Sequence, residues 1–269
     1  MSDKQVSQLR LVYDQKTNKG QVRKVNEDAK FVKPWPDKSA LLAVVADGMG
    51  GQRGGKEAAK IAIDTFKELL KQPLPATPEE RYHFLLQGFH AADQAIREQA
   101  SQDFGLMKMG ATVVAAIITQ SECLHLYAGD CRFYHFSGDT SPYVTSDHTP
   151  ISVLLKLGEI TPEESVNHPM RSVVMSCLGG GEKAKLSVDP KWNDPNSPVL
   201  RELHPGDVLV LCSDGLHGEM SDSELQDFVK ISKKSPAQLT QSCVDYALKQ
   251  GGKDNISMVA IVVQEEDKL

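Results

Sequence analysis

Residues 41–51 read LLAVVADGMGG, an apolar run that meets an acid and then glycines. The first six residues are apolar without alternation, which is typical of a β-strand covered on both faces. Asp47 follows, where we expect the strand to end and the chain to leave the core. Gly48, Gly50 and Gly51 allow a tight turn and a close approach of the backbone to a ligand. A carboxylate at such a point can bind a metal ion or stabilise the turn.

The composition favours one globular domain. The chain has 269 residues, 40% hydrophobic and 25% charged, which is enough to build a sizeable core. Its formal net charge is −6 and it has no basic cluster, which argues against nucleic acid as the main partner. No apolar stretch approaches the roughly 20 residues of a membrane helix, and the N-terminus lacks the apolar core of a signal peptide. The five cysteines form no C-x-x-C pair, which indicates reduced thiols in a cytoplasmic protein.

Helices are grouped between runs of strands, a pattern that favours α+β layers over a doubly wound parallel sheet. Strands are expected at 9–14, 29–33, 41–46, 110–119, 122–129, 131–136, within 204–214, and at 256–263. Helices are expected at about 55–71 and 151–157, and from Thr77, Thr161, Ser221 and Ser235. The starts at Thr77 and Ser221 carry capping boxes, because a glutamate follows three residues later.

Acids recur at the ends of these strands. Asp47, Asp130 and Asp214 follow apolar strands, and Asp28 and Asp254 precede them. If these strand ends share one edge, the five carboxylates converge and raise one another's pKa unless a divalent cation neutralises them. Oxygen ligands favour Mg²⁺ or Mn²⁺ over zinc, and two such ions can activate one water for attack on phosphorus. Each aspartate alone could also be a turn residue.

Seven short motifs contain these acids and their neighbours. They are Asn26-Glu27-Asp28, Asp47-Gly48-Met49-Gly50-Gly51, Gly110-Ala111-Thr112, Gly129-Asp130, Asp147-His148-Thr149, Ser213-Asp214-Gly215 and Asp254-Asn255. In this order, over about residues 20–263, the motifs resemble those of the PP2C-type (PPM) protein serine/threonine phosphatases, bacterial members above all. The resemblance implies a four-layer α-β-β-α sandwich with two central, mainly antiparallel sheets. It also implies a single domain over residues 1–269, with a flap subdomain at about 147–180 beside the site.

The resemblance also implies a role for most of the acids. Asp47 would bridge two Mn²⁺ or Mg²⁺ ions, and the Gly48 carbonyl would complete the shell of one. Asp28, Asp214 and Asp254 would bind the other ion directly or through water. Through these metals, Asp47 and Asp214 would hold the water that attacks phosphoserine or phosphothreonine, with no phosphoenzyme.

Three further residues are carried over by their motifs. Glu27 would hold metal-bound water, and Asp130, with Asp214, would match the third, weaker metal site of bacterial members. Arg23 lies where the family keeps an arginine that grips the phosphate, a role that suits a bidentate guanidinium. Many eukaryotic members have a histidine in place of Met49 that is proposed to protonate the leaving oxygen, so here the general acid has no assigned residue. His148 is interpreted as structural.

The sequence therefore predicts a cytoplasmic, monomeric, metal-dependent phosphatase. Its partners would be phosphorylated proteins and a cognate serine/threonine kinase, with no nucleic acid and no membrane. One alternative is a catalytically inactive PP2C-like regulatory binding module, although every expected aspartate is present. Another is a nucleotide-binding protein, because residues 50–56 fit G-x-x-x-x-G-K. In that reading Glu57 stands where a phosphate-binding loop needs serine or threonine.

Overall fold

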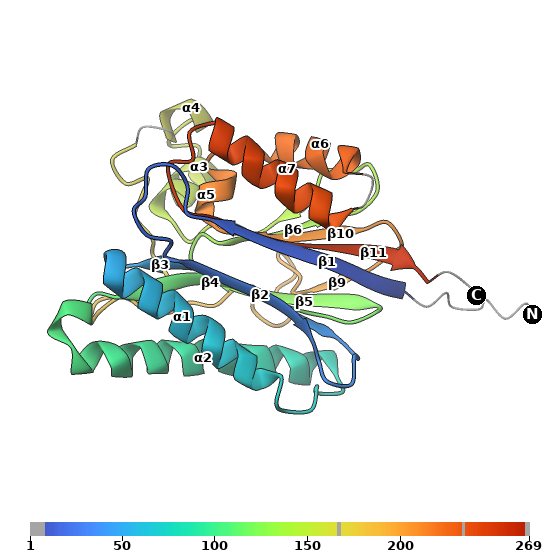
Figure 1. The fold of residues 1–269 in the computed structure, drawn as a ribbon, viewed down its shortest axis with the longest axis horizontal. Coiled ribbons are helices and arrows are strands. Elements are labelled where there is room, and N and C mark those ends of the chain that lie inside the picture. Colours follow the sequence, from blue (N-terminus) through green and yellow to red (C-terminus); the bar gives the residue numbers. More distant parts are fainter. Residues whose placement is uncertain (1–8, 166–167, 233–234, 267–269) are drawn as a thin grey trace, which may run out of the picture.

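Two β-sheets lie face to face between two layers of helices (Figure 1). The computed structural model describes residues 9–165, 168–232 and 235–266. Every strand pair in these residues is antiparallel, whether the strands come from neighbouring or from distant parts of the chain. The predicted α-β-β-α class is therefore confirmed. None of the described helices is both long and apolar enough to cross a bilayer.

The sheets draw on both ends of the chain. The first has the order β1 (Leu9–Asn18), β11 (Ile256–Glu265), β10 (Val208–Cys212), β6 (Arg132–Phe136) and β7 (Tyr143–Val144). The second has the order β2 (Asp28–Pro34), β3 (Leu41–Met49), β4 (Gly110–Ile118), β5 (Glu122–Ala128) and β9 (Leu200–Glu202), and β8 (Leu178–Gly179) pairs with β4.

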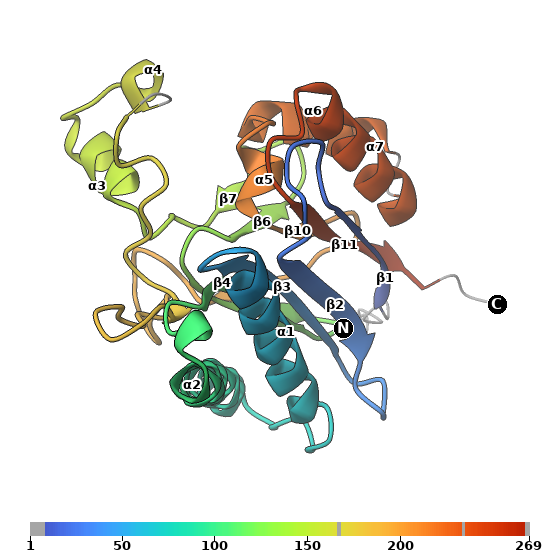
Figure 2. The ribbon, with the colours of Figure 1, turned by 60° about the vertical axis from the view of Figure 1, so that its left-hand side comes forward.

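Helices cover the outer face of each sheet. On the second sheet lie α1 (Gln52–Leu69), α2 (Pro78–Gln102) and the short 3-10 helix η1 (Phe104–Leu106). On the first lie α5 (Asp214–His217), α6 (Asp222–Ile231) and α7 (Pro236–Lys249). The segment that the sequence predicts as a flap, residues 147–180 (called the flap segment below), carries α3 (Pro150–Leu157) and α4 (Pro162–Ser165), and its residues 166–167 lie outside the described part. Figure 2 shows α3 and α4 standing away from the body, on the side of α5.

Strand β3 explains the continuous apolar run of the sequence. Alternate side chains of a strand point to opposite faces of the sheet. Leu42 and Val44 pack in the core formed with α1 and α2, whereas Ala43 and Val45 pack in the core between the sheets. Both faces are therefore dry, and all four residues are fully buried.

Several predicted boundaries were wrong by a few residues. Strand β3 runs on to Met49, which pairs with Gly110, so Asp47 lies inside the strand and not after it. Strand β1 continues to Asn18 because its whole length pairs with β11, and α1 begins at Gln52, three residues before the predicted start. The predicted capping boxes at the starts of α2 and α6 are confirmed.

Candidate metal centre

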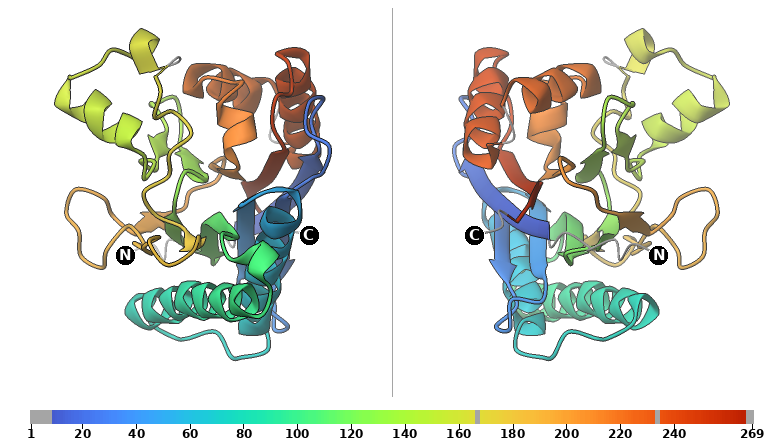
Figure 3. Two further views of the ribbon diagram at one scale, coloured as in Figure 1. Left: turned by 90° about the vertical axis from the view of Figure 1, so that its left-hand side faces the viewer. Right: turned by 90° about the vertical axis from the view of Figure 1, so that its right-hand side faces the viewer.

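The site begins with two aspartates that face each other across β2 and β3. Asp28 pairs with Asp47, and Asp47 pairs in turn with Thr112 on β4. Directly paired residues project from the same face, with Cβ atoms about 4.5–5.5 Å apart. The strand alternation that sends Val45 into the core between the sheets sends Asp47 to the end of that core. Figure 3 (left) looks onto this end of the sheets.

The opposite sheet brings Ser213 and two more aspartates to the same end. Ser213 follows β10 and donates its hydroxyl to Asp28 Oδ2 at 2.7 Å. Asp214 opens α5 directly after it, and Asp254 lies two residues before β11. Since β10 and β11 are antiparallel neighbours, the end of one lies beside the start of the other. The strand order of this sheet therefore positions Asp214 and Asp254 together.

Arg23 and Glu27 close one side of the cluster. The Arg23 guanidinium lies 2.6 Å from Asp254 Oδ2 and 4.0 Å from Glu27 Oε2, and its side chain is 48% exposed. The main-chain N–H of Glu27 donates to Asn255 Oδ1 at 2.8 Å. Asn255 also donates to the carbonyl oxygens of Lys19 and of a second residue in the β1–β2 loop. This asparagine therefore fixes the loop that carries Arg23 and Glu27 to the start of β11.

Two glycines let α1 approach the site. A Cβ atom on Gly48 would lie 2.0 Å from the carbonyl oxygen of Gly55, and one on Gly55 would lie 2.4 Å from Glu27 Oε1. Neither distance is compatible with a side chain. Gly54 and Gly55 lie within the first turn of α1 and not in a loop that could wrap a phosphate. This geometry, together with Glu57, removes the nucleotide-binding alternative.

One histidine contacts the main chain of Asp130, and a second contacts that of its neighbour Gly129. His217 Nε2 lies 2.9 Å from the Asp130 carbonyl oxygen, and burial lowers the pKa of His217 to about 4, so the neutral ring donates this hydrogen bond. The N–H of Gly129 donates to His148 Nδ1 at 3.2 Å, and His148 Nε2 lies 3.1 Å from Asp189 Oδ2. The structural role expected for His148 agrees with these contacts.

The carboxylates raise one another's pKa. Burial, followed by the charges of Asp28, Asp214 and Asp130, raises the pKa of Asp47 well above its usual range. Burial is also the main cause that brings the pKa of Asp28 and of Asp130 to about 7, and that of Asp214 to about 6. Burial likewise raises the pKa of Glu27. The cluster as it stands therefore holds more negative charge than its surroundings stabilise.

The donor set fits a divalent cation. Glu27 Oε1, Asp28 Oδ1 and Asp214 Oδ1 are buried without a hydrogen-bond donor. Buried charges are normally paired or bind metals. Within the described part of the chain, no three His, Cys, Asp or Glu side chains form a ready-made metal-binding group. Mg²⁺ keeps several water ligands and needs only one or two carboxylates, so a set of separate carboxylates suits a hydrated ion of this kind.

The structure brings all the predicted site residues to one end of the sheets: Arg23, Glu27, Asp28, Asp47, Gly48, Asp130, Asp214 and Asp254. Sequence reasoning gave no role to Ser213 and Asn255, although both flank a predicted ligand and that position was a usable signal. His217 carried no such signal, because its partner is a main-chain carbonyl distant in sequence.

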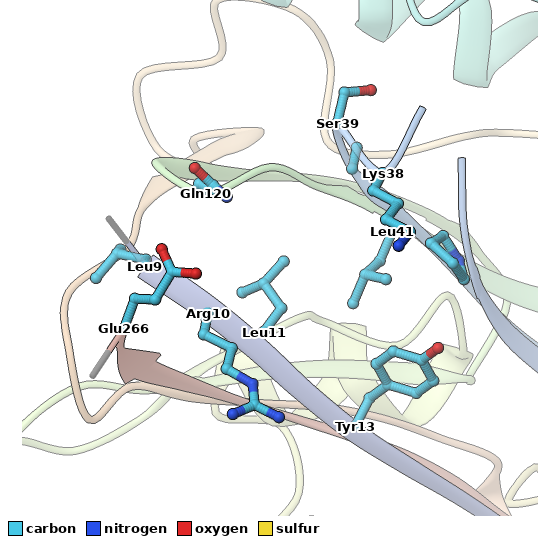
Figure 4. Close-up of a pocket in the computed structure, with 11 residues that line it drawn as sticks. Leu9, Arg10, Leu11, Tyr13, Lys38, Ser39, Leu41, Gln120 and Glu266 are labelled. Atoms are coloured by element: carbon cyan, nitrogen blue, oxygen red, sulfur yellow. The ribbon is translucent and has the colours of Figure 1, made fainter. Parts of the chain in front are cut away.

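A cavity of about 270 Å³ lies at the end of the sheets opposite to the aspartates (Figure 4). Leu9, at the start of β1, and Leu41, at the start of β3, line it together with Arg10 and Lys38. The aspartates of the metal centre lie near the other ends of β1 and β3, so this cavity is remote from them. None of the predicted site residues contributes to it.

Comparisons with known proteins agree with this geometry. A model of the Protein phosphatase 2C family matches residues 17–250. The serine/threonine phosphatase stp of Listeria innocua is 31% identical over 247 residues, which cover 91% of this chain and 93% of that protein. The protein phosphatase PhpP of Streptococcus pneumoniae is 31% identical over 252 residues, covering 93% and 97%.

Solved structures share the fold. The Mycobacterium tuberculosis serine/threonine phosphatase PstP/Ppp superposes with a TM-score of 0.79 at 29% identity, covering 95% of this chain and 99% of that one. The catalytic domain of PstP in complex with two manganese ions superposes with a TM-score of 0.78 at 27% identity, covering 96% and 100%. With the family profile matched over most of its length and its strand-end aspartates gathered at one site, this chain belongs to the Protein phosphatase 2C family.

Proposed function

We propose that this chain removes phosphate from phosphoserine and phosphothreonine in proteins, and that it does so at the end of the sheets where the aspartates gather. The observation that supports this function most strongly is the position of Asp47. It lies close enough to Asp28, Asp214 and Asp130 for all three charges to raise its pKa. Relatives that align with more than nine-tenths of the chain are named serine/threonine phosphatases.

We infer that the site takes two Mn²⁺ or Mg²⁺ ions, and Asp47 would be a ligand of both. Asp28, Asp214 and Asp254 would hold one ion, and the carbonyl of Gly48 would complete the shell of the other. When bound, such ions polarise the phosphoryl oxygens and lower the pKa of water, so that water can attack phosphorus directly. The manganese-bound PstP domain, a solved structure with the same fold, supports this choice of metal.

Two further acids would complete the metal centre. Glu27 would hold water beside the metals, since one of its carboxylate oxygens is buried without a donor. Asp130 would form a third site with Asp214, and the charge of Asp214 already raises the pKa of Asp130.

Arg23 is the residue that we expect to bind the substrate phosphate. It lies at the rim of the cluster, and nearly half of its side chain is exposed. One of its terminal nitrogens donates to Asp254, which orients the guanidinium and leaves its other N–H groups for a phosphate. Met49 has no titratable group, so protonation of the leaving oxygen falls to another group of the site.

We further infer that the protein is a cytoplasmic monomer that opposes a serine/threonine kinase of the same cell. The family pattern alone supports this step. We also infer that the flap segment covers the substrate, since Arg171 and Ser172 line a cavity together with Asp214 and Asp254. Phosphoproteomes of cells with and without the protein test the kinase proposal, and identical phosphoproteomes would overturn it.

The deciding experiment is Mn²⁺-dependent phosphate release from a phosphothreonine peptide. We expect Asp214→Asn, which keeps the shape but removes a charge, to lower kcat/KM by on the order of 100-fold or more. Asp245→Asn, an exposed position on α7, is the matched control and should retain activity. Wild-type activity that survives a chelator would contradict the metal-dependent mechanism. No wild-type activity at any Mn²⁺ concentration would favour the inactive binding module.

A further inference from the structure

A cavity of about 240 Å³ adjoins the proposed metal centre at Asp214 and Asp254. Asp214 and Asp254, which belong to the proposed metal centre, form one part of the wall, and Lys253 and Glu219 form another. The flap segment contributes Arg171 and a neighbouring serine. The cavity therefore lies between the end of the first sheet that carries these aspartates and the part of the flap segment that follows α4.

Its position makes it a place for substrate residues. A phosphoresidue bound at the metals leaves its peptide neighbours only about 3.8 Å away per residue, measured between consecutive Cα atoms. Because Asp214 and Asp254 belong both to the cavity wall and to the proposed metal centre, a side chain next to the phosphoresidue can enter the cavity. The identity of that side chain depends on the charge of the remaining wall.

The remaining wall carries a net positive charge. Lys253 and Arg171 are cations, and Glu219 is the one further acid among the lining residues. In the proposed function the carboxylates of Asp214 and Asp254 are neutralised by divalent ions. Among the lining side chains, two cations and one further acid then remain, on a protein whose overall charge is −6.

The Lys253 ammonium is available to a ligand. It lies 3.7 Å from Glu219 Oε1, longer than a normal hydrogen bond, and its side chain is 75% exposed. An exposed pair of this kind contributes little stability, so an incoming anion can compete for the ammonium. Glu219, by contrast, is only 10% exposed, so its carboxylate keeps its position when an anion competes for the ammonium.

We propose that this cavity binds an anionic side chain of the substrate close in sequence to the phosphoresidue, and that Lys253 is the specificity-determining residue. This inference rests on the proposed function. A carboxylate and a second phosphate group share the required chemistry. The preference should be about two- to fivefold in kcat/KM, the size of one solvent-exposed ion pair.

The test uses a phosphothreonine peptide with neutral flanks and Mn²⁺. A glutamate, a lysine or a non-hydrolysable phosphonate analogue of phosphoserine is placed at each of the three positions on either side. We expect wild type to prefer glutamate over lysine at one or two positions, Lys253→Arg to keep this preference, Lys253→Gln to remove it, and Lys253→Glu to invert it. Lys230→Gln, an exposed charge at the end of α6, is the matched control and should keep the wild-type ratio.

The outcomes separate the two proposals. Hydrolysis of the neutral peptide with equal kcat/KM for glutamate, lysine and the phosphonate at every position would overturn the anionic subsite and leave the phosphatase function standing. A preference that Lys253→Glu does not change would overturn the role of Lys253. No hydrolysis of any peptide would overturn both. A gain with the phosphonate but not with glutamate would identify a second phosphate as the ligand.

Discussion

Ser213 Oγ donates a hydrogen bond to Asp28 Oδ2 at 2.7 Å, and this contact joins the two sheets where the aspartates gather. The same hydroxyl accepts the N–H of Ser257 on β11 at 3.0 Å. Ser213 is fully buried. One hydroxyl therefore ties β11 to β2 and also stabilises the charged form of Asp28, whose pKa it lowers.

We expect Ser213→Ala to lower the free energy of unfolding by about 1–3 kcal/mol, because a buried carboxylate and a buried N–H both lose a partner. The affinity for Mn²⁺ should fall as well, because ionised Asp28 loses a donor. Urea unfolding and calorimetric Mn²⁺ titration measure the two effects. Ser223→Ala, an exposed position at the start of α6, serves as the control. Unchanged values for both quantities in Ser213→Ala would contradict this role.

The local parts of this site were predictable from the sequence, and the cross-sheet parts were not. An apolar run that ends in an acid is a local signal, so Asp47 and Asp214 stood out. The contact between Ser213 and Asp28 joins residues far apart in the chain, and it depends on how the two sheets stack. Stacking is set by side-chain packing over the whole core, which leaves no short pattern to read. For the same reason, the sequence did not predict the hydrogen bond between His217 and the carbonyl oxygen of Asp130.

The free cluster should destabilise the protein as the pH rises. The pKa values of Asp28 and Asp130, about 7 in the folded protein, lie above the roughly 3.9 of an unfolded chain. The contribution of these two aspartates to the free energy of unfolding is therefore complete below about pH 4, and it is lost as the pH rises through about 7. A divalent cation removes the repulsion, so Mn²⁺ should raise the Tm more at pH 8 than at pH 5.

Asp47→Asn tests this charge effect directly. In chelator at pH 8, we expect the free energy of unfolding of the variant to exceed that of wild type by about 1–3 kcal/mol, because the substitution removes the central charge of the cluster. The gap should narrow at pH 5, and the variant should be inactive. Thermal unfolding at the two pH values, with and without Mn²⁺, gives the measurement. Equal stability of variant and wild type at pH 8 would show that the carboxylates do not repel one another.

Two neighbouring glycines of α1 allow a matched comparison. A Cβ on Gly55 would lie 2.4 Å from Glu27 Oε1 and 2.7 Å from the Gly48 carbonyl oxygen, whereas one on Gly54 would lie 3.1 Å from Met109 Cβ at its nearest. Gly55→Ala should cost about 1–3 kcal/mol of stability and lower Mn²⁺-dependent activity, because α1 must move away from the site.

Gly54→Ala should cost far less, because alanine gains about 1 kcal/mol of helix propensity to set against a small shift of Met109. Urea unfolding and phosphate release for both variants give the comparison. If the two substitutions had equal effects, the close approach of α1 to Glu27 would not matter for the site.

His125 should make the protein sensitive to acid. Its ring is fully buried, stacks on Phe133 with centroids 4.3 Å apart, and leaves Nδ1 without a hydrogen-bond partner. Burial lowers its pKa to about 3. The neutral ring therefore contributes stability that is complete above the unfolded pKa of about 6.5 and is lost as the pH falls toward 3.

Because of His125, we expect the free energy of unfolding of wild type to fall by about 2–3 kcal/mol as the pH falls from 7 to 4.5. His125→Leu should remove that part of the loss, although it costs stability at pH 7 through the lost stacking on Phe133. His90→Leu, an exposed position on α2, should keep the wild-type pH dependence. Half-buried His217 titrates in the same direction in all three proteins, so urea unfolding at the two pH values isolates the contribution of His125. An identical pH dependence of wild type and His125→Leu would mean that the ring already binds a proton in the folded protein.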